Sequence, residues 1–562
     1  MRTRATWRAN TGRVMSSFTS DNPHSEHPNT QYPIPNTRSE IGLARSAGIL
    51  GLGNIASRVI GLARESVISG YFGSSGELSA FNLAARVPTM IYDLLVGGML
   101  SAALVPVFSD YARPERREEL ARVASAVFSL IAVAMAAIVI LLELFAGPIA
   151  GVLGDFEDPA LQGVLARSLR VIAPAVLLFG LSGGVTGLLY SLKRFSYTAL
   201  SGAVFNLGIV IAAPLLANRI GVYALPLGII GGSLLQLAVL LPGLRDLRLG
   251  LSAAWEHPAV RRILRLYVPI ALGLIVTQVQ IIVDGRWASA TGEQSVSWMR
   301  YATTLIQLPL GLVPVAVSLA ALPSLSQRAA AADWEGFRGI FARGLRLVLV
   351  LLIPAAVGLW VLAQPVIRLL FEHGSFLPAD TVMTAKALRF YLLGLMFAGV
   401  DFLLNYTFYA RQDTRTPAIV GVIAVGFYFV AALALKGPLG FLGLVLADSV
   451  KQAGHALIMT GLLLHSVGRL RGQRIQGTAL KAAAAALAMG IGVWWLIGWL
   501  GARVPAGLAG EVAVVAVAAG AGGALYLLAL RLLGVEEVVA LVNLLPRKLS
   551  RPGGPGKRSE RG

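Results

Sequence analysis

Long apolar segments follow one another along almost the whole sequence. Fourteen of them lie between residues 46 and 534. Segments of about 20 apolar residues cross the hydrocarbon core of a bilayer as helices, because a backbone in lipid must satisfy its own hydrogen bonds. We therefore expect an all-α polytopic membrane protein with 14 transmembrane helices. The predicted spans are residues 46–73, 79–108, 121–153, 163–191, 196–218, 221–244, 262–290, 296–326, 339–363, 382–410, 416–435, 438–466, 477–501 and 508–534.

Composition favours a transporter over an enzyme. Apolar residues make up 56% of the 562 residues, charged residues make up 14%, and the mean hydropathy is +0.70. The sequence has no cysteine, which excludes disulfides, thiolate metal sites and cysteine nucleophiles. It also has no phosphate-binding glycine loop ending in Lys-Ser or Lys-Thr, so we expect no ATP hydrolysis. A secondary transporter with no cofactor and no metal site is the prediction.

Basic residues predict the orientation in the membrane. A net charge of +19 would suggest nucleic-acid binding in a soluble protein, but cytoplasmic loops of membrane proteins collect Lys and Arg. One set of alternate loops carries 20 basic residues, and the opposite set carries four. We therefore expect the first set and both termini in the cytoplasm, and no nucleic-acid partner. The four are Arg219, Arg368, Lys436 and Arg503; the 20 are Arg113, Arg116, Arg117, Arg122, Lys193, Arg194, Arg245, Arg248, Arg261, Arg262, Arg265, Arg328, Arg338, Arg343, Arg346, Arg411, Arg415, Arg469, Arg471 and Arg474.

An internal repeat predicts two lobes. Residues 170–199 resemble residues 389–418 at an offset of 219, and residues 102–106 resemble residues 320–323 at nearly the same offset. Six helices separate the copies, so we expect two parallel six-helix lobes related by an axis along the membrane normal. The predicted domains are a disordered cytoplasmic segment without a signal peptide (1–45), an N-lobe (46–244), a C-lobe (245–466), two helices outside the repeat (467–545) and a basic cytoplasmic tail (546–562).

Charged side chains inside the predicted spans are the first candidates for a site. A charge near the bilayer centre costs from about 3 to 15 kcal/mol, so such residues usually face a bundle interior or a wet cavity. Arg58 and Glu65 are seven residues apart and should share one face of the first helix, with Arg64 turned aside. Arg86 and Asp93 repeat that spacing on the second helix.

Arginines of four predicted helices are candidates for lining a cationic chamber between the lobes. Arg58, Arg86, Arg286 and Arg300 lie on predicted helices 1, 2, 7 and 8. Guanidinium groups stay protonated and hold phosphates through paired donors, so the chamber would suit a diphosphate. A plainer interpretation stays open. Arg86 and Arg300 would snorkel to the interface, and Asp284 would pair with Arg286 or face the external surface.

Carboxylates within the spans are the candidates for binding a coupling ion, Na+ or H+. Asp401 lies near the middle of its span, and Asp284 is the second candidate. Asp448 and Lys451 are three residues apart and are expected to form a structural ion pair. His455 lies on an apolar helix and is expected to be a hydrogen-bonded packing residue.

Several motifs resemble those of one known family, the MurJ (MviN) lipid II flippases. The similarity runs in order from residue 46 to residue 530, with 14 spans in both. The motifs are Ser57–Glu65 (SRVIGLARE), Phe72-Gly73, Ala80-Phe81, Arg86-Val87-Pro88, Gly98–Pro106 (GMLSAALVP), Ser295–Met299 (SVSWM) with Tyr301-Ala302, Ala320–Ser326 (AALPSLS) and Tyr409–Pro417 (YARQDTRTP).

This resemblance implies a fold and a function. The fold is the two-lobed one of the multidrug/oligosaccharidyl-lipid/polysaccharide exporters. The function is moving lipid II, the undecaprenyl-diphosphate-linked peptidoglycan precursor, from the inner to the outer leaflet of a bacterial plasma membrane by alternating access. In the family a cationic cavity holds the head of the substrate, and helices 13 and 14 help form a groove for its tail. Arg58, Arg64 and Glu65 match positions tied to substrate handling or gating, and Arg86 replaces a lysine. Membrane lipids are expected partners, and cell-wall synthesis or division proteins are candidate partners.

The sequence departs from the family pattern at several cavity positions. Tyr92 and Asp93 stand where the family has arginines, and Thr304 stands where it has another. Arg300 precedes Thr304 by one turn on the same helix face, about 6 Å away. We hypothesise that Arg300 and Arg286 restore the lost charge. Further departures are Ser79, Gly97–Met99, Thr303 and Gln307.

Three other functions stay open at this point. The missing arginines favour a flippase for another polyprenyl-diphosphate-linked glycan. A non-transporting scaffold for envelope assembly would tolerate neutral substitutions at Arg58. A drug antiporter needs an acidic, aromatic cavity, which the arginines disfavour.

Overall fold

Helices make up the regular structure of this protein, and the computed structural model has no strand in the residues that it describes. Those residues are 37–94, 103–505, 507–535 and 537. The chain divides into two units, residues 1–48 and residues 49–562. Helix α1 (Thr37–Phe72) begins in the first unit, and all the contacts considered below lie within the second.

The start of α1 corrects one expectation. Residues 37–45 were expected to be disordered, but they already belong to α1. Apolar content is a poor guide to where a helix begins, because each residue added to an existing helix gains a hydrogen bond whatever its side chain. The rest of the predicted segment 1–45, Gly97–Met99 and the tail 546–562 lie outside the described residues.

Sixteen further α-helices follow in the described residues, with short 3₁₀ turns between some of them. Many begin at recognisable signals. Asp158 accepts a hydrogen bond from the Ala160 backbone N–H at 2.8 Å, with Pro159 in the first helical position of α6. The helices are α2 (Gly76–Tyr92), α3 (Val105–Tyr111), α4 (Arg117–Leu144), α5 (Ala146–Leu153), α6 (Pro159–Ser191), α7 (Phe195–Ile220), α8 (Ala224–Leu240), α9 (Pro258–Ala290), α10 (Ser295–Ala330), α11 (Trp334–Val361), α12 (Ala363–Phe371), α13 (Pro378–Ala410), α14 (Arg415–Leu439), α15 (Phe441–Val467), α16 (Ile475–Gly501) and α17 (Leu508–Leu532).

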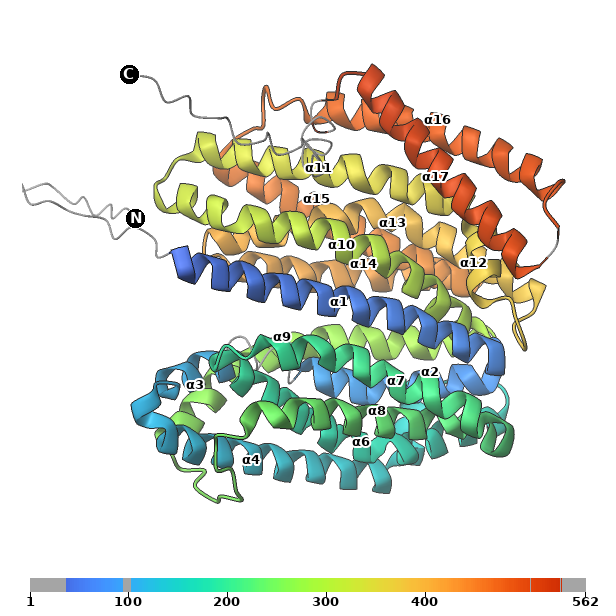
Figure 1. Ribbon diagram of the computed structural model, residues 1–562. Helices are drawn as coiled ribbons and strands as arrows, with labels where there is room; N and C mark the ends of the chain where they lie inside the picture. The colour runs from blue at the N-terminus through green and yellow to red at the C-terminus, as the bar shows by residue number, and fades with distance from the viewer. Residues whose placement is uncertain (1–36, 95–102, 506, 536, 538–562) are drawn as a thin grey trace, which may run out of the picture. The chain divides into compact units, whose positions relative to one another are not determined.

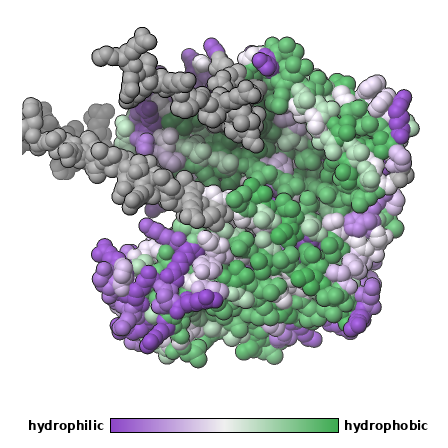
Figure 2. Space-filling model, viewed as in Figure 1, coloured by the Kyte–Doolittle hydropathy of each residue, from purple (hydrophilic) through white to green (hydrophobic). Residues whose placement is uncertain are grey.

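Length and composition identify this as a polytopic membrane protein. Among the described residues, nine helical stretches are long and apolar enough to cross a bilayer. The predicted span 121–153 is divided at Phe145 into α4 and α5, and α12 follows α11 after a one-residue break at Leu362. The number 14 stays a prediction. In Figure 2 the visible face carries apolar residues over most of its middle and hydrophilic residues toward its two ends, as expected for a surface in contact with lipid.

The helices pack in two groups that follow chain order. Helices α2, α4, α6, α7 and α8 pack with one another, and α10, α11, α13, α14 and α15 form a second set of neighbours, with α16 against α11 and α17 against α16 (Figure 1). Helix α1 touches both groups, because Arg64 bonds Asn206 of α7 and Arg58 bonds Gln307 of α10. Side chains of α1 are therefore placed where the two groups meet.

Candidate functional site

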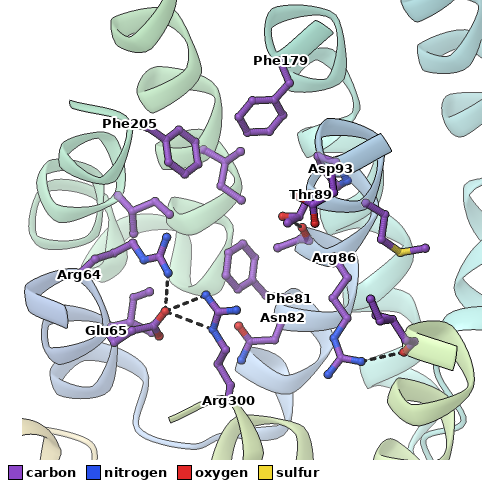
Figure 3. Close-up of a pocket in the computed structure, with 17 residues that line it drawn as sticks. Arg64, Glu65, Phe81, Asn82, Arg86, Thr89, Asp93, Phe179, Phe205 and Arg300 are labelled. Atoms are coloured by element: carbon purple, nitrogen blue, oxygen red, sulfur yellow. Dashed lines mark hydrogen bonds and ion pairs between the residues drawn. The ribbon is translucent and has the colours of Figure 1, made fainter. Parts of the chain in front are cut away.

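A small cavity that contains several charged side chains lies where α1, α2, α6, α7, α8, α9 and α10 meet, and its volume is about 140 Å³. Three arginines and two carboxylates line it, together with apolar and aromatic side chains (Figure 3). The lining residues are Arg64, Glu65, Ile68, Phe81, Asn82, Ala85, Arg86, Pro88, Thr89, Met90, Asp93, Phe179, Phe205, Ile209, Ile229, Ile281 and Arg300.

Glu65 is the centre of the charge network in this cavity. Its side chain is only 3% exposed, and one of its oxygens accepts hydrogen bonds from Arg64 at 2.5 Å and from Arg300 at 3.0 Å. Arg64 also donates to the Asn206 side chain at 2.9 Å. The expectation that Arg64 is turned aside from Glu65 is therefore wrong. A carboxylate this deeply buried is stable only with such partners.

One donor in this network has no partner in the described residues. Arg64 Nε is buried and makes no hydrogen bond. A buried guanidinium N–H without an acceptor costs about 1–3 kcal/mol, so it marks a position where an oxygen of water or of a ligand would be favourable.

Arg86 enters the cavity from α2 and joins it to α9. It donates to the Ile281 carbonyl at 3.1 Å and lies 3.7 Å from the Asp284 carboxylate. Gly285 makes this possible, since a Cβ there would lie 2.6 Å from the Arg86 guanidinium. The second carboxylate oxygen of Asp284 accepts a hydrogen bond from the Tyr428 hydroxyl of α14 at 2.6 Å. Asp284 therefore pairs with α2 and α14 and not with Arg286.

Two of the six predicted substrate-binding residues lie outside the cavity lining. Arg58 donates to the Gln307 carbonyl at 2.8 Å and packs over Gly311 of α10. Arg286 lies 3.2 Å from Asp155, in the connection between α5 and α6. Arg300 reaches the cavity, as the hypothesis of charge replacement requires, whereas Arg286 is engaged elsewhere.

Asp93, an acidic departure from the family pattern, also lines the cavity, at the point where α2 ends and a π-helical turn follows. Sequence reasoning missed Asn82 and Asn206 as site residues. Asn206 is polar within the apolar segment 196–218, and that was the available signal. Thr304, which stands where the family has an arginine, does not line the cavity. Its hydroxyl donates to the Arg300 carbonyl of the same helix at 3.0 Å.

A second set of contacts ties the end of α1 to the connection between α12 and α13. The Ser375 backbone N–H donates to the Gly70 carbonyl at 2.9 Å, and the Ser66 hydroxyl donates to the Leu370 carbonyl at 2.6 Å. Gly374 has φ +61°, and a Cβ there would lie 2.1 Å from the Gly70 oxygen. We call the contacts of residues 66–73 with residues 370–376 the α1–α13 latch.

Two predictions in the second helix group concern Asp401 and Asp448. Asp401 of α13 bonds His455 of α15 and accepts a hydrogen bond from Asn405 at 2.9 Å. The predicted pair of Asp448 with Lys451 is confirmed, with 2.5 Å between the charged atoms.

The fold matches those of membrane transporters with known structures. It superposes on a lipid II flippase MurJ in an inward closed conformation with a TM-score of 0.72 and 24% identity, over 88% of this chain and 99% of that one. An inward-facing multidrug resistance MATE family transporter of the MOP superfamily gives a TM-score of 0.63 with 14% identity, over 74% of this chain and 95% of that one. The chain thus has the fold that these polytopic membrane transporters share.

Sequence comparisons narrow the class to one family. The family model described as "Lipid II flippase MurJ" matches residues 68–504. The lipid II flippase MurJ of Burkholderia cenocepacia is 31% identical over 418 residues, which cover 72% of this chain and 80% of that protein. The probable lipid II flippase MurJ of Vibrio cholerae is 29% identical over 526 residues, 88% of this chain and 97% of that protein. The chain belongs to the lipid II flippase MurJ family, whose members are bacterial inner-membrane transporters.

Proposed function

We propose that this chain moves lipid II from the inner to the outer leaflet of a bacterial plasma membrane by alternating access. The observation that carries the proposal is the buried Glu65 held by Arg64 and Arg300 in a cavity between helices. Two guanidinium groups directed at one carboxylate form a site for an oxyanion, and a diphosphate offers more oxygens than a carboxylate does.

In this proposal the Glu65 carboxylate occupies the oxyanion site when no substrate is bound. The substrate diphosphate competes with the Glu65 carboxylate for Arg64 and Arg300, and the free Nε of Arg64 gives it a further donor. Release of the diphosphate then lets Glu65 close the site again. Arg86 adds a third cation beside the same cavity, and Asn82 and Asp93 offer hydrogen-bond partners for sugar hydroxyl groups.

The cavity must enlarge before it can hold a whole head group. Its volume is about 140 Å³, whereas pockets for drug-sized ligands measure about 300–1,000 Å³. A diphosphate with a disaccharide and a peptide is larger than such ligands. The structure therefore corresponds, in the proposed cycle, to a state in which the helix groups have closed around the arginines.

The proposed orientation places both termini in the cytoplasm and the α1–α13 latch at the outer side, because α1 crosses the membrane once before residues 66–73. The two helix groups act as the two lobes, 46–244 and 245–466, and the latch joins them at the outer surface. Opening outward then requires the bond from Ser375 to Gly70 to break.

The test is flipping by the purified full-length chain in liposomes that contain lipid II labelled on its head group. A membrane-impermeant reagent then reports how fast the label appears on the opposite leaflet. We expect wild type to accelerate this appearance over empty liposomes and Arg300→Gln to abolish the acceleration. Equal rates with and without the wild-type chain would overturn the proposal. Rescue of cells depleted of their own lipid II flippase is the matching test in vivo.

A further inference from the structure

A buried carboxylate and a buried imidazole lie side by side in the second helix group, away from the arginine cavity. Asp401 Oδ1 bonds His455 Nδ1, and their side chains are 16% and 11% exposed. His455 is near the middle of α15, a helix of 27 residues. At about 1.5 Å per residue it is roughly 20 Å from either end of the helix, within the depth of a hydrocarbon core about 30 Å thick.

Permanent cations balance two of three carboxylates that lie on α9, α13 and α15, namely Asp284, Asp401 and Asp448. Asp284 lies 3.7 Å from Arg86, and Asp448 lies 2.5 Å from Lys451. Asp401 is the third, and among the described residues its only cationic partner is the imidazole of His455, which is charged only when it carries a second proton. The Asp401–His455 pair is therefore neutral when the imidazole carries the additional proton and has one negative charge without it.

The groups around Asp401 and His455 do not change the charge of the pair, so its charge depends mainly on this one proton. Asn405 donates to the other Asp401 oxygen at 2.9 Å. Lys451 precedes His455 by one turn of α15, and Tyr409 of α13 interacts electrostatically with Asp401. From α14 the Pro417 backbone interacts with the imidazole, and a Cβ added at Gly421 would lie 3.9 Å from its Nε2. Asp284 of α9 is bonded to Tyr428 and lies beside Arg86. In the described residues, no charged side chain of α9, α10, α11 or α14 forms a hydrogen bond or ion pair with Asp401 or His455.

We propose that Asp401 and His455 form a proton-binding site that is loaded and unloaded during the transport cycle. This inference rests on the proposed function and supplies its coupling ion. One proton enters from the outer water, is held as an N–H of the imidazolium facing the Asp401 carboxylate, and leaves to the cytoplasm. On loading, an N–H bond forms as an O–H bond of hydronium breaks, and on release water takes the proton back, so water is the only other reactant.

A proton fits this site better than a metal ion does. Hard cations take oxygen ligands. Here one Asp401 oxygen faces an imidazole nitrogen and the other accepts the Asn405 amide N–H, which leaves few oxygens for a cation. Histidine is the side chain whose ordinary charge change falls nearest neutral pH, so an imidazole is suited to taking up and releasing a proton.

The first test reads the proton directly and does not depend on transport. The full-length chain is labelled with ¹⁵N-histidine, and the ring nitrogens are followed by NMR between pH 5 and 9. His455→Gln identifies the signal, and His465→Gln on the same helix is the matched control, because His465 is exposed in the last turn of α15. We expect the His455 signal to titrate and to shift in Asp401→Asn. A His455 signal that stays constant over the whole range would overturn the site.

The second test couples the site to transport in the lipid II liposomes. A gradient of one pH unit changes the ratio of loaded to empty sites by up to about tenfold, so wild-type and His465→Gln flipping should respond several-fold. The His455→Gln and Asp401→Asn chains should flip lipid II at a rate that does not depend on the pH gradient. A response in His455→Gln equal to that of wild type overturns the proposal, as does acceleration by a Na+ gradient alone. If wild type does not flip lipid II at all, the proposed function fails, and the NMR titration still decides the proton site.

Discussion

Arg300 of α10 and Glu65 of α1 are 235 residues apart in sequence, yet Nη2 of the arginine lies 3.0 Å from Oε1 of the carboxylate. Arg64 bonds the same oxygen. This single oxygen therefore joins α1 to α10 and holds two guanidinium groups that, in the proposed cycle, must be released to bind the substrate diphosphate. The strength of the Glu65 contacts then sets a balance between binding and release.

Replacing Glu65 by Gln tests that balance. The neutral amide no longer competes for the two arginines, so we expect tighter binding of the diphosphate lipid and slower release. Removing one charge of such a buried pair shifts free energies by about 3–5 kcal/mol, so flipping should fall by tenfold or more. Binding is measured on the purified chain and flipping in liposomes. Glu143→Gln is the control, since Glu143 is an exposed carboxylate in α4. Weaker binding in Glu65→Gln would show that the carboxylate supports the substrate site and does not compete for it.

The hypothesis that Arg300 and Arg286 restore the charge of the missing family arginines can be tested for each residue separately. Arg300 lines the cavity, whereas Arg286 lies at Asp155 outside it. We expect Arg300→Gln to lose rescue of flippase-depleted cells and Arg286→Gln to keep it. Arg300→Lys should recover little, because an ammonium group does not reproduce the paired donors of a guanidinium. Equal loss in both Gln variants, at equal expression, would place Arg286 in the transport cycle after all.

Gly311 offers a way to move Arg58 without changing it. A Cβ at Gly311 would lie 2.0 Å from Arg58 Nη2, and the arginine would have to leave the Gln307 carbonyl. We expect Gly311→Ala to impair flipping as much as Arg58→Ala does. Gly426→Ala is the control, because Gly426 lies inside α14 with nothing within 4 Å of a Cβ. Normal flipping in Gly311→Ala would show that the Arg58 contact is structural only.

Sequence was informative about which residues matter and less so about how they meet. Apolar length indicated the helices, and intramembrane charge indicated Arg86 and Arg300, which line the cavity. Arg64 was indicated only by the resemblance to the family. Helical spacing failed for Arg64, because position on a helix fixes the Cβ and not the end of a long, flexible side chain. The partners of Asp284 and Arg286 also could not be predicted, since Arg86 and Asp155 come from other segments and are brought near only by packing.

Gly374 is required in the α1–α13 latch for two reasons, its positive φ and the close approach of the Gly70 oxygen, and these can be tested separately. Gly374 and Gly440 have nearly the same positive φ, +61° and +59°, but a Cβ at Gly374 would meet the Gly70 oxygen at 2.1 Å, whereas one at Gly440 meets nothing within 4 Å. Alanine at either position should be strained, because L side chains rarely adopt a positive φ. Only Gly374→Ala should also separate α1 from the connection between α12 and α13.

Cysteine labelling measures that separation, because the natural chain has no cysteine. Ser69 is fully buried within the α1 segment of the latch, so a Ser69→Cys chain should react slowly with a membrane-impermeant maleimide added from outside. We expect Gly374→Ala to raise the labelling rate by tenfold or more and Gly440→Ala to leave it unchanged. An equal rate in all three chains would mean that the latch does not close the outer side. A rise in both glycine variants would instead indicate general destabilisation, because they share only the backbone strain.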